Sequence, residues 1–131
     1  MEKQVALELR NVTKRFGTVV ANKDINFTLY KEEILSLLGE NGSGKTTLMN
    51  MISGIYYPDE GEIFVNGEKA SIRSPKDAFD YKIGMIHQHF KLVDVFTAAQ
   101  NVVLGIDDGK RYNLKDVNSR VSEIAKKYGF D

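Results

Sequence analysis

A run of glycines followed by a lysine and two threonines is the part of the sequence where residue types and spacing point most directly to chemistry. The stretch "LLGENGSGKTTLMN" covers residues 37–50, and in it Gly39 is followed, after four residues, by Gly44, Lys45 and Thr46. This spacing fits the phosphate-binding loop pattern GxxxxGK(S/T). Backbone N–H groups can surround charged oxygens where no Cβ atom intervenes. The stretch therefore predicts a phosphate site.

A nucleoside triphosphate with Mg²⁺ is the ligand that this pattern favours. The N–H groups of residues 42–45 are expected at the positive end of the following helix. Lys45 is predicted to lie across the β and γ phosphates, the Thr46 hydroxyl to bind Mg²⁺, and Thr47 to reach the α phosphate. The alternative is a glycine turn that caps an ordinary helix. The predicted nucleotide-binding residues of the loop are Gly39, Glu40, Asn41, Gly42, Ser43, Gly44, Lys45, Thr46 and Thr47.

The segments on either side of the loop suit this role. Residues 33–38 form a mostly apolar run, which is typical of a strand covered on both faces, and this run leads straight into the loop. After the loop, apolar residues at helical spacing predict a helix over 45–53, with Gly54 placed to end it. The expected order is buried strand, loop and helix.

Further strands are predicted from alternating polarity and from short apolar runs, over residues 5–9, 25–29 and 83–87. Gly17 marks a turn between the first two of these strands. The stretch "GEIFVNGEKA" predicts a hairpin, because Asn66 and Gly67 can adopt the two positive φ angles of a tight primed turn. No repeat or low-complexity tract interrupts this alternation of strands and helices.

Capping residues predict two short helices. Ser74 and Pro75 fit the cap and first position of a helix to about residue 81, and Thr97 with Gln100 forms a capping box for a helix to about residue 104. A last helix, closed by Gly129, is expected from one apolar face made of Val117, Val121, Ile124 and Tyr128.

The composition excludes several classes of protein. The 131 residues include 18 Lys plus Arg and 18 Asp plus Glu, so the zero net charge gives no reason to expect nucleic acid as a partner. The absence of cysteine excludes disulfides and thiolate metal sites. Neither a signal-peptide pattern nor an 18-residue apolar span is present. The sequence predicts a soluble, cytosolic chain.

Three separated stretches resemble the ATP-binding cassette (ABC) ATPases of membrane transporters, and the likeness covers essentially the whole chain. They are "LRNVTKRFGTVVANKDINFTL", "LLGENGSGKTTLMNMISGIYYPDEGEIFVNGEKA" and "IGMIHQHFKLVDVFTAAQNVVLG". The stretches GENGxGK(S/T)TL and H-Q-H-F are similar to those of sugar and nucleoside importer ATPases. The resemblance implies an α/β phosphate-loop NTPase fold of the ABC-ATPase type, as a partial domain with an N-terminal antiparallel β subdomain and the start of a RecA-like core.

The resemblance also implies roles for two residues outside the loop. Phe16 matches the aromatic residue that stacks on adenine, although a core or turn phenylalanine is the alternative. Gln88 matches the Q-loop glutamine that contacts Mg²⁺ and the attacking water; a solvated loop glutamine is the alternative. Lys45 and Gln88 are therefore the predicted catalytic residues, and Thr46 and Gln88 the predicted metal ligands.

Two features near Gln88 leave alternatives open. His87 and His89 flank it, but two histidines without a third ligand fall short of the usual zinc donor set. The segment 90–96 is unusually apolar for a loop. It fits either a contact with a membrane subunit or packing inside the same domain.

Three motifs that complete an ABC ATPase site are absent: an LSGGQ-like signature, an apolar strand ending in Asp-Glu, and a switch histidine. The nearest match to the strand is "VVLGIDD" at residues 102–108, which Gly105 interrupts and in which Asp108 replaces the glutamate. The capping box upstream instead predicts a helix end there. Residues 1–131 are thus expected to be the N-terminal part of one nucleotide-binding domain, with little ATPase activity and a tendency to self-associate.

The resemblance implies partners as well as cofactors. The expected ligands are ATP and Mg²⁺, and the expected partners are transmembrane permease subunits, a second nucleotide-binding domain and, indirectly, a solute-binding protein. This would place the protein on the cytoplasmic face of the cell membrane. Two alternatives remain. One is a complete small kinase or GTPase that uses Asp94 or Asp107, although no NKxD motif is present. The other is a nucleotide-binding module without catalysis.

Overall fold

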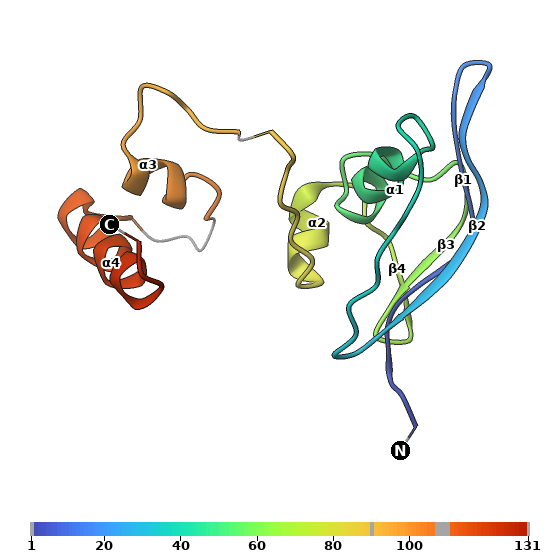
Figure 1. Cartoon of the computed structure of the whole chain (residues 1–131), viewed down its shortest axis with the longest axis horizontal. Helices are drawn as coiled ribbons and strands as arrows, with labels where there is room; N and C mark the ends of the chain where they lie inside the picture. Colours follow the sequence, from blue (N-terminus) through green and yellow to red (C-terminus); the bar gives the residue numbers. More distant parts are fainter. Residues whose placement is uncertain (1, 90, 107–110, 131) are drawn as a thin grey trace. The chain divides into compact units, whose positions relative to one another are not determined.

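A computed structural model describes residues 2–89, 91–106 and 111–130 (Figure 1). The chain divides into two compact units, residues 1–86 and 87–131. The loop predicted to bind phosphate lies in the first unit, and Gln88 lies in the second.

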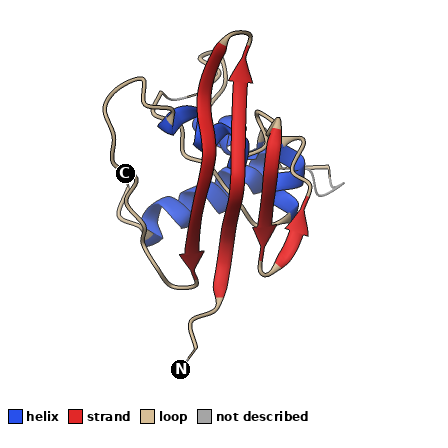
Figure 2. Ribbon diagram, turned by 90° about the vertical axis from the view of Figure 1, so that its right-hand side faces the viewer, coloured by secondary structure: helices blue, strands red, loops and turns tan. Residues whose placement is uncertain are grey.

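The first unit contains a four-stranded antiparallel sheet (Figure 2). The strand order is β2-β1-β3-β4. Both predicted turns are confirmed: Gly17 has a φ of 59°, and Asn66 and Gly67 have φ angles of 52° and 83°. These left-handed angles suit the primed turns that join antiparallel strands. The strands are β1 (Val5–Phe16), β2 (Val19–Tyr30), β3 (Glu60–Val65) and β4 (Glu68–Ala70).

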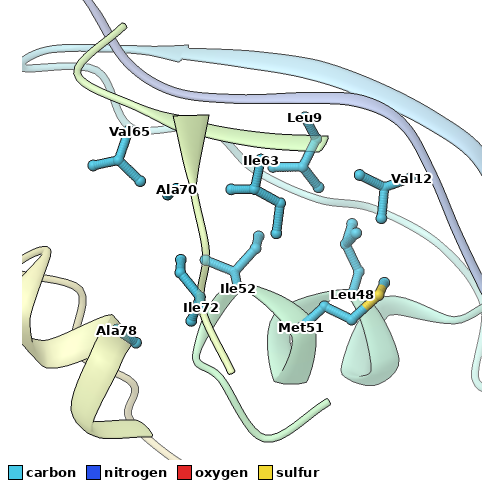
Figure 3. Packing of buried hydrophobic residues seen from close by; sticks show 10 residues of the cluster. All are labelled: Leu9, Val12, Leu48, Met51, Ile52, Ile63, Val65, Ala70, Ile72 and Ala78. Carbon is cyan, nitrogen blue, oxygen red and sulfur yellow. The ribbon is translucent and has the colours of Figure 1, made fainter. Parts of the chain in front are cut away.

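The first unit also contains helices α1 (Lys45–Ile52) and α2 (Pro75–Asp80), both as predicted. The Ser74 hydroxyl caps α2 by accepting a hydrogen bond from the Asp77 N–H at 3.2 Å. Helix α1 packs its buried face against the inner face of the sheet (Figure 3). The apolar core formed there consists of Leu9, Val12, Leu48, Met51, Ile52, Ile63, Val65, Ala70, Ile72 and Ala78.

Two predicted strands are wrong. Residues 33–38 and 83–87 are without regular secondary structure, and neither pairs with another strand in the described part of the chain. Ile34, Leu38 and Ile86 are 96%, 90% and 96% exposed. An apolar run favours a strand only where a neighbouring strand can accept and donate its backbone hydrogen bonds. Both runs are apolar as predicted, but among the described residues no neighbouring strand pairs with them.

The second unit contains helices α3 (Ala98–Val103) and α4 (Leu114–Lys127). The predicted capping box is confirmed: Gln100 N–H donates to Thr97 Oγ1 at 3.2 Å, and Thr97 N–H donates to Gln100 Oε1 at 2.9 Å. Gly129 follows α4 with a φ of 75°, also as predicted.

Helix α3 includes the first two residues of the stretch "VVLGIDD". Val102 and Val103 belong to α3, so they are not part of a strand, in agreement with the prediction of a helix end. Asp107, Asp108 and Phe90 lie outside the described residues. Within the described ranges, no helix has both the length and the apolar character needed to cross a bilayer.

Candidate functional site

The glycine loop folds back on itself between residues 39 and 44. Ser43 N–H donates a hydrogen bond to the Glu40 carbonyl oxygen at 3.2 Å, and Gly42 and Gly44 have φ angles of 81° and 93°. A Cβ atom added at Gly39 would lie 2.6 Å from Ser43 Oγ. A Cβ atom at Gly42, by contrast, would meet nothing within 4 Å, so the loop is closely packed at Gly39 and open at Gly42.

Helix α1 begins directly after this loop without a capping side chain. Gly44 is its N-cap residue, and neither a side-chain cap hydrogen bond nor an acidic residue is found in its first turn. The first N–H groups of a helix have no partner within the helix and carry a positive partial charge. This end of α1 suits a phosphate group. Thr46 is exposed and Thr47 is half-buried at the same end.

Lys45 connects the two ends of the loop. Its Nζ donates a hydrogen bond to the carbonyl oxygen of Gly39. The ammonium group therefore lies beside the backbone of the loop that is predicted to hold phosphate. A lysine so placed acts as a point charge on a phosphate chain.

Strand β2 contacts the last glycine of the loop, a contact that the sequence analysis missed. Asn22 Nδ2 donates a hydrogen bond to the Gly44 carbonyl oxygen at 3.1 Å. A Cβ atom at Gly44 would lie 2.4 Å from the Ala21 carbonyl oxygen and 2.6 Å from Asn22 Nδ2. The only signal for this contact in the sequence is the polar side chain of Asn22. The sequence predicted that the strand begins at residue 25, but β2 begins at Val19 and therefore includes Asn22.

Phe16 lies at the end of β1 and is 41% exposed, so it is not a core residue. The edge of its ring meets Tyr56, with 5.1 Å between the ring centroids and an interplanar angle of 69°. Lys14 Nζ lies 5.3 Å from the centroid of the same ring. A partly exposed ring held in this way can present a flat apolar surface to a base. Stacking of Phe16 on adenine stays a prediction.

Asp59 fixes the end of β1 near Phe16. Its Oδ2 accepts a hydrogen bond from the Arg15 backbone N–H at 2.7 Å, and Lys14 Nζ lies 3.5 Å from its Oδ1. The Arg15 N–H, followed by the charge of Lys14, lowers the pKa of the Asp59 carboxyl. The Asp59 N–H also donates to the Thr13 carbonyl oxygen at 2.9 Å. Asp59 is thus charged at neutral pH and restrains β1 on both sides of Lys14.

The loop residues and Phe16 all belong to the first unit. Strand β2 connects them, because it contacts Gly44 of the loop and pairs with the end of β1 that bears Phe16. Gln88, His87 and His89 belong to the second unit, so the role of Gln88 also stays a prediction. Among the described residues, no group of three or more His, Cys, Asp or Glu side chains could hold a metal ion. Binding of Mg²⁺ by Thr46 stays a prediction.

Comparison with known proteins agrees with this geometry. Residues 22–131 match the ABC transporter family. The chain is 46% identical, over 131 residues, to the nucleoside import ATP-binding protein NupA of Lactococcus lactis, which covers 98% of this chain. It is 48% identical, over 128 residues and 96% of this chain, to the guanosine import ATP-binding protein NupO of Bacillus subtilis. The chain spans only 26% and 25% of these two relatives.

Solved structures show the same relationship. A dimeric bacterial ABC transporter cassette superposes with a TM-score of 0.73 at 27% identity, covering 92% of this chain and 56% of that cassette. The fold is that of an ABC ATPase, here as a partial domain with its antiparallel β subdomain at the N-terminus. The chain belongs to the family of ABC transporter ATP-binding proteins.

Proposed function

We propose that this chain binds Mg²⁺-ATP through residues 39–47 and serves as the nucleotide-binding part of a transporter that imports sugars or nucleosides. The observation that carries the proposal is the uncapped N-terminus of α1 behind a loop whose glycines leave the backbone open. Lys45, placed beside that loop, supplies the positive charge. The names of the relatives, which include importers of nucleosides and ribose, support the class of solute.

The finer assignments made from the sequence are part of the proposal. Thr46 is proposed to bind Mg²⁺ together with the phosphate oxygens, Gln88 to contact the metal and the attacking water, and Phe16 to stack on adenine. Mg²⁺ usually keeps several waters and takes few protein ligands, which suits a site with one hydroxyl. Bound Mg²⁺ would neutralise charge on the phosphates.

The wider assembly is part of the proposal. We infer that residues 1–131 form the N-terminal part of one nucleotide-binding domain, because the chain spans about a quarter of its relatives. In the whole protein, two such domains would close on ATP and drive permease subunits, supplied with solute by a binding protein. This assembly would lie on the cytoplasmic face of the membrane. Membership of the ABC family argues against the kinase or GTPase alternative.

Calorimetry of the chain with Mg²⁺-ATP tests the central claim. We expect saturable binding at one site per chain, and weaker binding when Mg²⁺ is replaced by a chelator, because the metal offsets phosphate charge. Circular dichroism of the same sample must show a folded chain. A folded chain that gives no binding signal with Mg²⁺-ATP would contradict the proposal.

Hydrolysis by the isolated chain is expected to be negligible. The chain offers Lys45, Thr46 and Gln88, but it lacks the strand ending in Asp-Glu whose glutamate polarises the attacking water. Without an oriented water, positioning of the γ phosphoryl group alone does little. Phosphate release should stay at the level of a Lys45→Ala control. Turnover that requires Mg²⁺ and disappears in that control would show this expectation to be wrong.

Self-association is the other expected property of the isolated chain. An open apolar groove of about 650 Å³ in the first unit is lined in part by Leu7, Phe27, Ile34, Leu37 and Met49. Exposed apolar surface of this kind promotes association. Sedimentation should show the average mass rising with concentration, and Ile34→Lys should reduce this rise, whereas Lys23→Glu should not. A single monomeric species at every concentration would rule the expectation out.

A further inference from the structure

Asn22 of β2 is a buried polar residue that contacts the phosphate loop. Its exposed fraction is 6%, and its Nδ2 donates to the Gly44 carbonyl oxygen at 3.1 Å. Its Oδ1 is buried and has no hydrogen-bond partner among the described residues. A carbonyl oxygen can only accept, so the amide nitrogen must face Gly44 and Oδ1 must face away.

Stability alone does not explain this asparagine. The Gly44 carbonyl oxygen already accepts the first hydrogen bond of α1, from Leu48 N–H at 2.9 Å. Removing Asn22 would therefore not leave that carbonyl unpaired. A buried, unpaired oxygen such as Oδ1 costs free energy, so leucine at this position should be about as stable as asparagine. What Asn22 adds is a directional link between β2 and the loop.

The pairing of β1 with β2 directs Asn22 toward the loop. The cross-strand pairs are Val12 with Ile25, Lys14 with Asn22, and Arg15 with Val20. Strand β2 thus has one extra residue on each side of Asn22 relative to β1. Such bulges change the direction in which a side chain points, and they are frequent beside functional sites.

The same pairing connects Asn22 to the aromatic ring of Phe16. Lys14 lies directly opposite Asn22, and Phe16 is two residues further along β1. Lys14 also lies beside the Phe16 ring and the Asp59 carboxylate. The Phe16 ring is thus linked to Gly44 through the Lys14 side chain, the backbone pairing of Lys14 with Asn22, and the Asn22 side chain.

We propose that Asn22 is a positioning residue that fixes the spacing between the base-stacking ring of Phe16 and the phosphate loop. This inference rests on the proposed ATP site. A ligand gains affinity from two contact regions only if both can be reached in one geometry. With Asn22 in place, the base and the phosphates of one ATP engage together. Without it, the loop still binds phosphate but is less well placed relative to Phe16.

Inorganic tripolyphosphate has phosphates but no base, so it can bind the phosphate loop without Phe16. Comparing it with ATP therefore distinguishes a positioning role of Asn22 from a general stabilisation of the loop. In Asn22→Leu we expect affinity for Mg²⁺-ATP to fall about tenfold, the value of one well-placed hydrogen bond, while affinity for tripolyphosphate changes less than about twofold. The melting temperature should stay close to that of the wild type. Calorimetry with both ligands gives the ratio of the two affinities.

Asn26→Leu is the matched control. Asn26 is on the same strand, and its Nδ2 donates to the Asp24 carbonyl oxygen at 2.9 Å and to Asn11 Oδ1 at 3.3 Å. These partners belong to β1 and β2 rather than to the phosphate loop. We expect both affinities to be unchanged in this variant.

Equal losses for ATP and tripolyphosphate in Asn22→Leu would overturn the proposal, as would an unchanged ratio in a folded variant. If Asn22→Leu does not fold, Asn22→Ala decides, since alanine removes the donor to Gly44 without adding bulk or charge. The ratio of the two affinities must still fall in that variant. A wild-type chain that binds neither ligand is a different result, which contradicts the proposed function and the positioning role together.

Discussion

Gly44→Ala is expected to abolish detectable binding of Mg²⁺-ATP. Gly44 has a φ of 93°, and a Cβ atom there would lie 2.4 Å from the Ala21 carbonyl oxygen. The backbone angle alone costs about 1–2 kcal/mol for a residue with a Cβ atom. The contact is too short to persist, so either the loop or β2 must move. Because the N–H groups of the loop then no longer converge, affinity should fall by at least about 100-fold, as measured by calorimetry.

Gly42→Ala separates backbone strain from steric collision. Gly42 belongs to the same loop and has a similar φ of 81°, but a Cβ atom there meets nothing within 4 Å. In this variant only the backbone strain remains as a cost. We therefore expect measurable binding, with an affinity for Mg²⁺-ATP about tenfold lower than that of the wild type. Melting temperatures of both variants show whether each is folded. Equal loss in the two variants would mean that contact with β2 is not what makes glycine necessary at Gly44.

Lys45→Ala is expected to have the second-largest effect, a loss of about 30- to 100-fold in affinity for Mg²⁺-ATP. Lys45 Nζ donates to the Gly39 carbonyl oxygen, so the ammonium group is already held at the loop before ligand binds. Hydrogen bonds that involve a charged donor contribute about 1.5–3 kcal/mol, roughly twice the neutral value. The side chain is not in the buried core, so circular dichroism should show an unchanged fold.

Lys23→Ala is the control for the loss of one positive charge, since Lys23 is an exposed lysine on β2. We expect its affinity for ATP to change less than about twofold, because exposed charges are screened within about 8–10 Å at physiological salt. Binding that survives in Lys45→Ala but falls in Lys23→Ala would show that general electrostatic attraction, rather than the loop, holds the nucleotide.

Local signals were sufficient to predict much of the fold. The Asn66-Gly67 turn, the Ser74 cap of α2 and the Thr97–Gln100 capping box are all found where the sequence placed them. Each depends on residues within a few positions of one another, so the chain itself carries the information. The loop and its helix are also local, which is why residues 39–47 were recognised as a unit.

Strand partners could not be predicted in the same way. The apolar runs at residues 33–38 and 83–87 were expected to be strands, but they have no partner in the described part of the chain and expose residues such as Ile34 and Ile86. A strand depends on hydrogen bonds to another segment, and composition does not show whether that segment is present. Conversely, β1 and β2 extend well beyond their predicted limits because they pair with each other along their length.

The sequence by itself determined the phosphate-loop pattern, the turns and the helix caps, because each is specified by spacing within a short segment. Only the tertiary structure decided why Gly44 must be glycine, since the atoms that exclude a side chain there belong to Ala21 and Asn22 of β2. It also decided that Phe16 is exposed and held by Lys14 and Tyr56. These contacts join residues that are far apart in the chain, and the pairing of strands and the packing of α1 bring them together.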